Sequence, residues 1–444
     1  MKWKTRPVGE ALRHRKGSIT IDDTTSYKLC RVQLHRRGVV LRQHLHGAEI
    51  NTKKQQVCKA GDFLVAEMDA KVGGYGFVPP ELDGAIVSSH YYLFELDASK
   101  LHPAFLEVIS QAQILQQQIV AKGSTNYSSI RPDSVLAWQI PLPDMEVQKR
   151  VARNFETIQA KLASVGKEIT HQETLLAKLK QAILQKAIAG KLTADWRAAH
   201  PDVEPASQLL HRIQAERARL IAAKKLRPEK PLPKITPAEI PFEIPQGWEW
   251  CRIVNATLVI VDCPHSTPQW TDKGMTCAKT GQFRRFHLDL TNRFYVSQQT
   301  YEERVERLVP KPDDILYSRE GSILGIACRI PAGEELCLGQ RMMLLRPHHP
   351  TSSAFIELML NSPHVTKIAD ESTLGGCAPH INVGEIKAFV IPLPPLAEQA
   401  AIVARVEVLM EHCRALAAEI AHTRTHAAHL LQAVLKEAFA PATK

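Results

Sequence analysis

Two long stretches of the chain repeat apolar residues at alternating steps of four and three. A period of 3.5 residues predicts helices that pair as a left-handed coiled coil. Each seam carries one polar residue at the same place, where it can fix the register of pairing. The first seam is Val151, Phe155, Ile158, Leu162, Val165, Ile169, Gln172, Leu176, Leu179 and Ile183, and the second is Ile402, Val406, Leu409, Cys413, Leu416, Ile420, Thr423, Ala427, Leu430 and Val434.

The two seams belong to an internal duplication. Ile140-Pro141-Leu142-Pro143 recurs as Ile391-Pro392-Leu393-Pro394, and between residues 140–189 and 391–440 there are 17 identities in 50 positions. The Pro-containing anchor is not helical, so helical composition alone does not explain the match. A helix of 45 residues is roughly 65 Å long at about 1.5 Å per residue. Its natural partner is its duplicate, and antiparallel pairing would hold a globular domain at each end.

The stretch before each Ile-Pro-Leu-Pro motif has the pattern of a mixed domain, with short apolar strands, a charged turn, one short helix and a glycine-containing loop. The short helices are expected near 103–119 and 353–360, and the loops at 122–127 and 375–380. We therefore predict an α+β chain of two globular α/β domains, each followed by a long helix, the two helices pairing as an antiparallel coiled coil. The expected segments are 1–144, 145–192, a connector with a short helix and a proline-rich strap at 193–245, 246–394 and 395–444.

The charge of the chain favours a polyanionic partner. The formal net charge is +10, and residues 1–60 contain 14 Lys and Arg against 4 Asp and Glu. The sequence contains no run of eighteen apolar residues, so it predicts no membrane span. We expect a cytoplasmic protein. Nine cysteines without a Cys-x-x-Cys pair fit reduced thiols. Cys263-Pro-His265 and Cys377-Ala-Pro-His380 do not have the spacing of a zinc module, so we predict no metal site.

Polar side chains near the predicted turns are of the types that bind DNA. Arg and Lys suit guanine edges and phosphates, Asn and Gln suit adenine, and Ser and Thr serve either. Each residue alone fits a solvated or structural role better than a DNA contact, and only their clustering near glycine-rich turns favours a reading surface. The DNA-binding candidates are Lys53, Lys54, Lys71, Tyr75, Ser89, His90, Asn126 and Tyr127 in the first domain and His265, Ser266, Lys279, Arg284, Arg285, Arg319, Gln340, Arg341 and His380 in the second.

No catalytic motif accompanies these residues. Gly190-Lys191 resembles part of a phosphate loop, but Gln185 stands where the first glycine belongs and Leu192 where Ser or Thr belongs. There is no Gly-x-Gly-x-x-Gly fingerprint and no Asn-Pro-Pro-aromatic tetrad to hold a flipped base. Glu385-Ile386-Lys387 has no neighbouring acid at a spacing that suits a metal-dependent nuclease. We predict no catalytic residues in this chain.

The sequence resembles the specificity subunits of type I restriction–modification systems over nearly its whole length. The most specific match is residues 391–399, Ile-Pro-Leu-Pro-Pro-Leu-Ala-Glu-Gln, and further matches are 184–193, Gly247-Trp248-Glu249-Trp250, 82–88 and 321–328. Residues 144–148 depart from the pattern and keep only Gln148 in full. This departure leaves the start of the first long helix open.

The resemblance implies two target recognition domains, each reading one half of a split, asymmetric site in double-stranded DNA. It also implies a coiled coil that docks two methyltransferase subunits, with restriction and translocase subunits completing the complex. S-adenosylmethionine, ATP and Mg²⁺ would then belong to those partners, and none to this chain. Three alternatives are a duplicated basic adaptor for nucleic acid or protein outside restriction–modification, the recognition region of a fused restriction–methylation enzyme, and a metalloenzyme using the Cys/His pairs.

Overall fold

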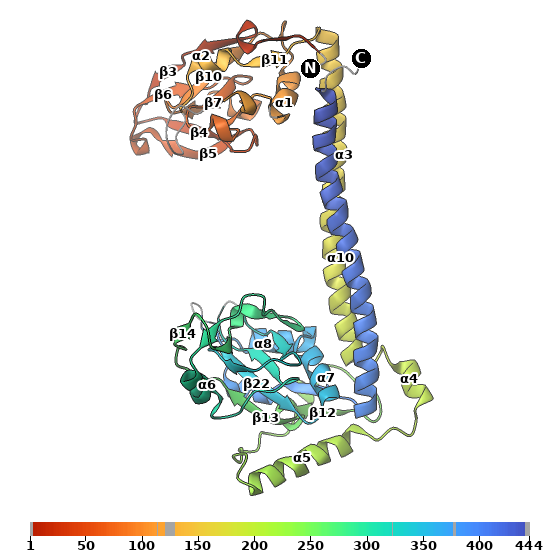
Figure 1. Ribbon diagram of the computed structural model, residues 1–444. Helices are drawn as coiled ribbons and strands as arrows, with labels where there is room; N and C mark the ends of the chain where they lie inside the picture. Colours follow the sequence, from red (N-terminus) through yellow and green to blue (C-terminus); the bar gives the residue numbers. More distant parts are fainter. Residues whose placement is uncertain (1–2, 113, 120–128, 322, 376–378, 440–444) are drawn as a thin grey trace. The chain divides into compact units, whose positions relative to one another are not determined.

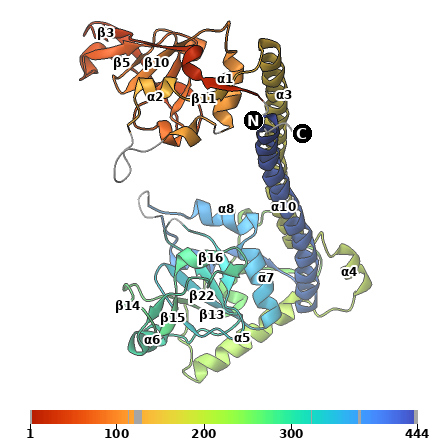
Figure 2. The ribbon, with the colours of Figure 1, turned by 45° about the horizontal axis from the view of Figure 1, so that its top comes forward.

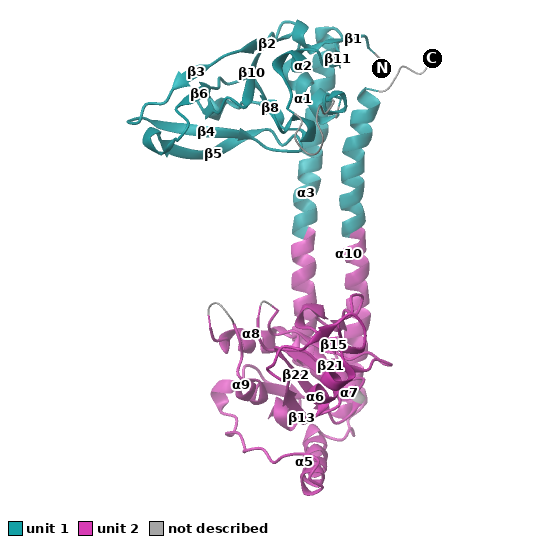
Figure 3. Cartoon of the chain, turned by 60° about the vertical axis from the view of Figure 1, so that its left-hand side comes forward, with its two compact units in different colours: residues 1–171, 420–444 teal, residues 172–419 magenta. Residues whose placement is uncertain are grey.

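The computed structural model describes residues 3–112, 114–119, 129–321, 323–375 and 379–439. The chain forms two compact units, residues 1–171 with 420–444 and residues 172–419 (Figures 1 and 3). Each unit combines one globular α/β domain with parts of both long helices. This division differs from the five expected segments, which separate the helices from the globular domains.

The core of unit 1 is a four-stranded antiparallel sheet. Its strands lie in the order β2 (Leu12–Arg15), β10 (Tyr91–Leu96), β7 (Phe63–Ala66) and β8 (Tyr75–Phe77). Strand β7 is buried along its length, and its Phe63 belongs to the same buried cluster as Phe105 of α1 (Pro103–Gln111). Strands β1 (Thr5–Pro7) and β11 (Gln139–Pro141) pair where the first Ile-Pro-Leu-Pro motif approaches the long helix, and α2 (Pro132–Leu136) precedes β11.

A second sheet of unit 1 packs against the first. It has five strands in the order β3 (Ser18–Thr20), β6 (Lys54–Val57), β9 (Ile86–Val87), β4 (Ser26–Val32) and β5 (Val39–His46). Cys30, Val32 and Val39 of this sheet share a buried cluster with Leu64 and Leu93 of the first sheet. Strand β5 is the outer strand and, among the described strands, pairs only with β4.

Unit 2 repeats the first of these sheets with the same topology. Its strands lie in the order β13 (Thr257–Asp262), β22 (Met342–Pro347), β19 (Ile315–Ser318) and β20 (Ala327–Arg329). Strands β12 (Glu249–Arg252) and β23 (Val390–Leu393) pair at the second Ile-Pro-Leu-Pro motif, as β1 and β11 do at the first. The helices around this sheet are α7 (Pro350–Leu360), α8 (Pro363–Glu371) and α9 (Val383–Ala388).

The two domains differ in their second sheets. The second sheet of unit 2 has four strands in the order β14 (Trp270–Thr271), β18 (Tyr295–Val296), β15 (Met275–Ala278) and β21 (Leu336–Leu338). Between β15 and β21 the chain also forms a hairpin, β16 (Phe283–Arg284) and β17 (His287–Leu288), and helix α6 (Gln298–Val305). In this sheet β15 and β21 run parallel. The duplicated core therefore carries two different elaborations. Short 3-10 turns lie at Val8–Glu10, Gly47–Glu49, Ala70–Val72, Pro80–Leu82, Gln116–Gln118, Pro237–Glu239, Ile253–Asn255 and Thr280–Gln282.

The charged turns predicted in both domains are structurally equivalent. The backbone N–H of Lys59 donates to the Asp62 carboxylate at 2.6 Å, and that of Lys311 donates to Asp314 at 2.8 Å. The residue before each aspartate, Gly61 or Asp313, has a positive φ of 84° or 66°. The prediction that the two domains share a plan is therefore confirmed in their central sheets. The short helix expected at 103–119 ends at Gln111, and the loop expected at 122–127 lies outside the described residues.

The long helices are α3 (Met145–Ile188) and α10 (Leu396–Ala438), of 44 and 43 residues. In unit 1 the beginning of α3 packs against the end of α10 through Phe155 and Leu435. In unit 2 the end of α3 packs against the beginning of α10 through Ile183 and Ile402. The helices thus run antiparallel within each unit, as expected, and lie side by side in Figures 1 and 2.

The predicted seam is only partly buried. Ile169, Ile183 and Cys413 are buried, Ile158, Leu162, Leu176, Leu409, Ile420 and Ala427 are half-buried, and Gln172, Thr423, Val165, Leu179, Leu416 and Leu430 are exposed. Gln172 and Thr423, the predicted polar residues of the seam, are therefore open to solvent. Near the end of α10 the buried residue is Leu435 instead of Val434. A helix with 3.6 residues per turn drifts about 20° per heptad from a strict seam, and a single neighbour covers each seam from one side only.

The connector is anchored in unit 2 by a buried carboxylate. Glu398 at the start of α10 is 1% exposed and accepts hydrogen bonds from Trp248 Nε1 at 2.8 Å, Thr193 Oγ1 at 2.8 Å and Arg197 Nε at 3.1 Å. These donors come from α4 (Ala194–Ala199), its N-terminal flank and the start of the second domain. The most specific sequence motif therefore has a structural task, which is to hold the connector against the base of the helix.

After α4 the connector forms the predicted short helix, α5 (Ala206–Ala222) (Figure 2). Its Leu209 and Ile213 are buried in the core of unit 2. The proline-rich strap that follows contains one 3-10 turn, Pro237–Glu239. None of the helices among the described residues is long and apolar enough to cross a bilayer.

Candidate nucleic-acid interface

Most of the described candidates in unit 1 are accessible. Lys54, Lys71, Ser89 and His90 are exposed. His90 Nδ1 lies 2.9 Å from the Glu67 carboxylate, which limits its freedom. Lys53 is half-buried, and its amine donates hydrogen bonds to the Asp23 carboxylate and to the Gly47 carbonyl. These internal partners compete with a DNA phosphate for the amine. Asn126 and Tyr127 lie outside the described residues.

Tyr75 was wrongly predicted as a DNA-binding residue. It is 1% exposed and packs between Phe63 and Trp138 in the core of unit 1. Burial raises the pKa of its hydroxyl to about 12, and that oxygen has no hydrogen-bond partner among the described residues. A tyrosine on a strand directly after a glycine turn fits a surface or a core equally well in sequence, and the packing of two sheets decides between them.

In unit 2 several candidates gather at one group of loops. Gln340 Nε2 donates to the His265 carbonyl at 2.8 Å, and His265 Nε2 lies 3.1 Å from the Asp262 carboxylate. Arg341 approaches Gly321, and His380 forms a β-bridge with Glu320. Gln340 and His265 thus meet from two different loops, and Arg341 follows Gln340 directly in the chain. Ser266 belongs to the same loop as His265.

Two buried arginines hold these loops in place. Arg319 is 5% exposed and pairs with Asp262 at 2.9 Å and Glu320 at 2.7 Å. Its guanidinium is therefore used inside the protein, and the prediction that it contacts DNA is wrong. Arg304, also 5% exposed, donates to four backbone carbonyls, those of Pro264, Ser266, Leu338 and Gly339.

Sequence reasoning missed Arg304. It lies in a charged segment, Tyr301-Glu302-Glu303-Arg304, that is typical of a solvated helix face. Only the contact of α6 with β21 turns its side chain inward. A buried charge that meets several carbonyls is expensive to remove, so Arg304 fixes the loop geometry without reaching a ligand.

The remaining candidates of unit 2 lie on other elements. The amine of Lys279 lies 4.1 Å from the Phe294 ring centroid and 4.6 Å from that of Trp270, which places it in a cation–π contact. Arg284 is exposed and donates to the Gly281 carbonyl at 2.8 Å. Arg285 donates to the Asn361 carbonyl at 3.4 Å.

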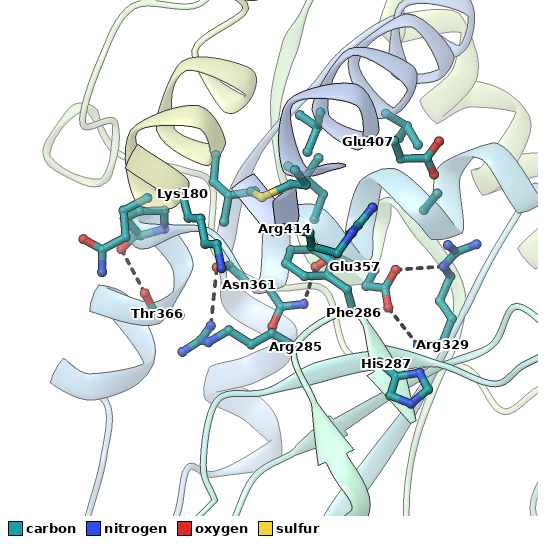
Figure 4. A pocket seen from close by; sticks show the side chains of 18 of the residues that line it. Lys180, Arg285, Phe286, His287, Arg329, Glu357, Asn361, Thr366, Glu407 and Arg414 are labelled. Carbon is teal, nitrogen blue, oxygen red and sulfur yellow. Dashed lines mark hydrogen bonds and ion pairs between the residues drawn. The ribbon is translucent and has the colours of Figure 1, made fainter. Parts of the chain in front are cut away.

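Arg285 also lines a cleft of about 1240 Å³ beside the long helices of unit 2 (Figure 4). Lys180 and Arg414 reach it from α3 and α10. Across it, Arg329 Nε pairs with Glu357 at 2.8 Å. Phe286, at the hairpin tip, is 40% exposed. Charges of both signs line this cleft, so its chemistry does not favour one polyanion.

The side chains at these loops can donate and accept hydrogen bonds. Among the described residues they form no arrangement typical of a catalytic site. No group of three or more His, Cys, Asp or Glu within the described ranges is placed to hold a metal ion. The eight cysteines of those ranges are buried free thiols, and Cys377 lies outside them. Arg, Gln, His and Ser at converging loops are the side chains that contact base edges and phosphates.

Comparisons with known proteins agree with this interpretation. A family described as the type I restriction modification DNA specificity domain matches residues 287–422. The EcoAI specificity subunit of Escherichia coli is 28% identical over 290 residues, covering 64% of this chain and 46% of that protein. The EcoEI specificity subunit, also from Escherichia coli, is 26% identical over 316 residues, covering 66% and 49%. The chain is therefore similar to the specificity subunits of type I restriction–modification systems. The resemblance predicted from the Pro-Leu-Pro-Pro-Leu-Ala-Glu-Gln run is confirmed.

Solved structures of the family share the fold over nearly the full chain. The HsdS subunit from Thermoanaerobacter tengcongensis is 20% identical with a TM-score of 0.56, covering 98% of this chain and 96% of that one. A chain from a structural study of assembly and conformational transition of the type I R-M system is 19% identical with a TM-score of 0.63, covering 99% and 97%. The matched region spans about half the length of the two curated relatives named above.

Proposed function

We propose that this chain is the non-catalytic DNA-specificity subunit of a type I restriction–modification complex, and that it reads a bipartite, asymmetric site in duplex DNA. The observation that carries this proposal is the duplication of one core with two different elaborations. The sheet β2-β10-β7-β8 and the sheet β13-β22-β19-β20 have one topology, whereas the second sheets differ in the number of strands and in the order in which the chain visits them. Two similar central sheets that carry different second sheets suit a DNA site whose two halves differ in sequence.

The long helices are proposed to dock two methyltransferase subunits and to set the spacing between the half-sites. Exposed apolar side chains on these helices support a docking role, because water-exposed apolar area favours association. They are Val165, Leu175 and Leu179 on α3 and Val408, Leu416 and Leu430 on α10. The duplicated helices suggest two copies of one partner.

Restriction and translocase subunits would complete the complex. S-adenosylmethionine, ATP and Mg²⁺ are proposed to act in the partner subunits, with the cytoplasm as the place of action.

The test is co-expression with the methyltransferase encoded beside this chain, followed by single-molecule sequencing of methylated DNA. We expect one bipartite site with methylated adenines. Exchange of residues 246–390 for the corresponding domain of another specificity subunit should change one half of that site only. An unchanged site, or a change in both halves, would contradict the two-reader arrangement.

A deletion tests the docking role separately. Removal of residues 397–444 should abolish assembly with the methyltransferase, because it removes α10 from both units. Stable assembly of the shortened chain, measured by co-purification, would refute docking on the paired helices.

A further inference from the structure

The second sheet of unit 1 ends in a strongly basic two-stranded ribbon, β4 and β5. Residues 24–48 contain five Lys and Arg and three His but neither Asp nor Glu. None of these basic residues is among the DNA-binding candidates chosen from the sequence. Strand β5 is the outer strand of the sheet, and its residues 41–44 are all exposed.

Three arginines of the ribbon are exposed and uncommitted. Arg31, Arg37 and Arg42 make no ion pair and no side-chain hydrogen bond within the described part of the chain. Arg31 points away from the protein core, because its neighbours Cys30 and Val32 are both buried in it. A guanidinium without an internal partner keeps all its donors for a ligand.

The backbone presents Arg42 in a particular way. Leu29 pairs with Gln43 and Cys30 with Leu41, so that Arg42 is the extra residue of a β-bulge. A bulge bends its strand and redirects the side chain that it carries. In this ribbon the redirected side chain is Arg42, on an outer strand whose free edge no other described strand covers.

The tip of the ribbon is strained and fixed. His35 and Arg36 both have left-handed backbones, with φ of 60° and 62°, which costs roughly 1–2 kcal/mol for each non-glycine residue. Hydrogen bonds from His35 N to the Val72 carbonyl at 2.8 Å and from Arg36 N to the Gly73 carbonyl at 3.0 Å hold this conformation. Arg36 is itself tied to Gln116 at 2.5 Å.

Arg37 follows directly after the two strained residues. Its backbone is fixed by them while its side chain stays exposed. A surface that served only solubility would not require two adjacent strained residues. A rigid tip loses little entropy when it binds, which is an advantage for a residue that contacts a ligand.

The shape of the ribbon suits the outside or the major groove of a duplex. The eight residues of β5 extend about 27 Å at about 3.4 Å per residue. The major groove is about 12 Å wide and admits a two-stranded ribbon. Duplex DNA carries one negative charge per roughly 1.7 Å of its axis, so three unpaired arginines along such a ribbon meet several phosphates.

We propose that the β4–β5 ribbon of unit 1 binds the phosphate backbone of the DNA duplex through Arg31, Arg37 and Arg42. This assignment rests on the proposed function and specifies how one domain acquires its affinity. The ribbon supplies salt-dependent, sequence-independent binding, whereas base reading lies with other loops. The described residues of unit 2 form no equivalent ribbon, since its second sheet is built from shorter strands.

The test compares two triple variants in the complete complex of this chain with its methyltransferase. The first is Arg31→Gln, Arg37→Gln and Arg42→Gln. The control is Lys225→Gln, Arg227→Gln and Lys230→Gln, which removes the same charge from exposed connector residues of unit 2 that have no ion pair within the described ranges. Kd is measured from 50 to 200 mM salt for a duplex with the methylated site and for a shuffled duplex.

We expect the slope of log K against log salt to become shallower by about 0.9 for each phosphate that the variant no longer neutralises, or about 2.7 for the ribbon variant. Both duplexes should be weakened alike, so their affinity ratio stays unchanged, and the control should keep the native slope. The single variant Arg37→Gln should lower the slope by about 0.9.

An unchanged slope in the ribbon variant, or an equal change in the control, would overturn the assignment. So would weaker binding confined to the duplex with the methylated site, because the arginines would then be base readers. Failure of the proposed function has a different signature, since the native complex itself would then show no preference for the methylated site.

Discussion

Replacement of Glu398 by alanine is the sharpest test of how unit 2 is held together. The carboxylate is 1% exposed and receives hydrogen bonds from Trp248, Thr193 and Arg197. Alanine leaves the indole N–H and the hydroxyl without an acceptor, and each unsatisfied donor costs about 1–3 kcal/mol when it stays buried. The side chain of Arg197 is 26% exposed and regains water, which limits its share.

Together these effects predict a destabilisation of about 3–5 kcal/mol, as is typical when one partner of a buried ion pair is removed. Because a chain of two units need not unfold in one transition, the effect is best followed locally. Hydrogen exchange of residues 189–200 should accelerate at least roughly 10²-fold in Glu398→Ala, since about 1.4 kcal/mol corresponds to a factor of ten.

Position 147 offers a matched control. It corresponds to Glu398 in the first copy of the repeat but is a half-buried valine. Val147→Ala removes two methyl groups from a partly exposed site and should leave the exchange of residues 189–200 near its native rate. The reasoning would be refuted if Glu398→Ala accelerated that exchange no more than Val147→Ala does.

Three further outcomes follow from particular side chains. Arg304→Ala should abolish selectivity for one half of the methylated site and spare the other, because it frees the loops of unit 2; methylation sequencing would contradict this if both halves stayed native. Tyr75→Phe removes a buried hydroxyl that has no described partner, so it should be neutral or stabilising by up to about 1 kcal/mol in thermal unfolding and should not alter the recognised sequence. Burial lowers the pKa of His364, whose ring lies between Phe242 and Trp250, so folding favours the neutral ring. The stability that it contributes is present above the unfolded pKa of about 6.5 and is lost as the pH falls below it. His364→Gln should therefore flatten the decline of stability between pH 7 and 5, and an unchanged pH profile would count against this role.

The sequence could predict the helices because their signals are local. Residues three and four apart share a helix face, so the apolar period gives α3 and α10 to within a few residues at most ends. The same holds for α5. The strands that pair with the two Ile-Pro-Leu-Pro motifs were not predicted, because their partners lie far away in sequence. The depth of the helix seam was less predictable, because burial of Leu416 or Gln172 depends on how much the neighbouring helix covers.

The candidate site was predictable in kind but less so in its members. Gln340 and His265 meet from two different loops, but the candidates at 75 and 319 are buried. A polar or aromatic side chain has no local signal that says whether a distant sheet will cover it. Arg31, Arg37 and Arg42 were overlooked for the opposite reason, since an alternating basic stretch does not reveal that its strand forms the open edge of a sheet.

The duplicated helices, the connector and the resemblance to specificity subunits could be read from the sequence, because periodicity and a short specific motif lie in neighbouring residues. Only the tertiary structure decided which charges face solvent and which are used inside. Arg304 and Arg319 bind backbone carbonyls and carboxylates of residues far away in sequence, whereas Arg37 finds no described partner at all. The reason is that desolvation and pairing of a charge depend on every segment folded around it, and these segments meet only in three dimensions.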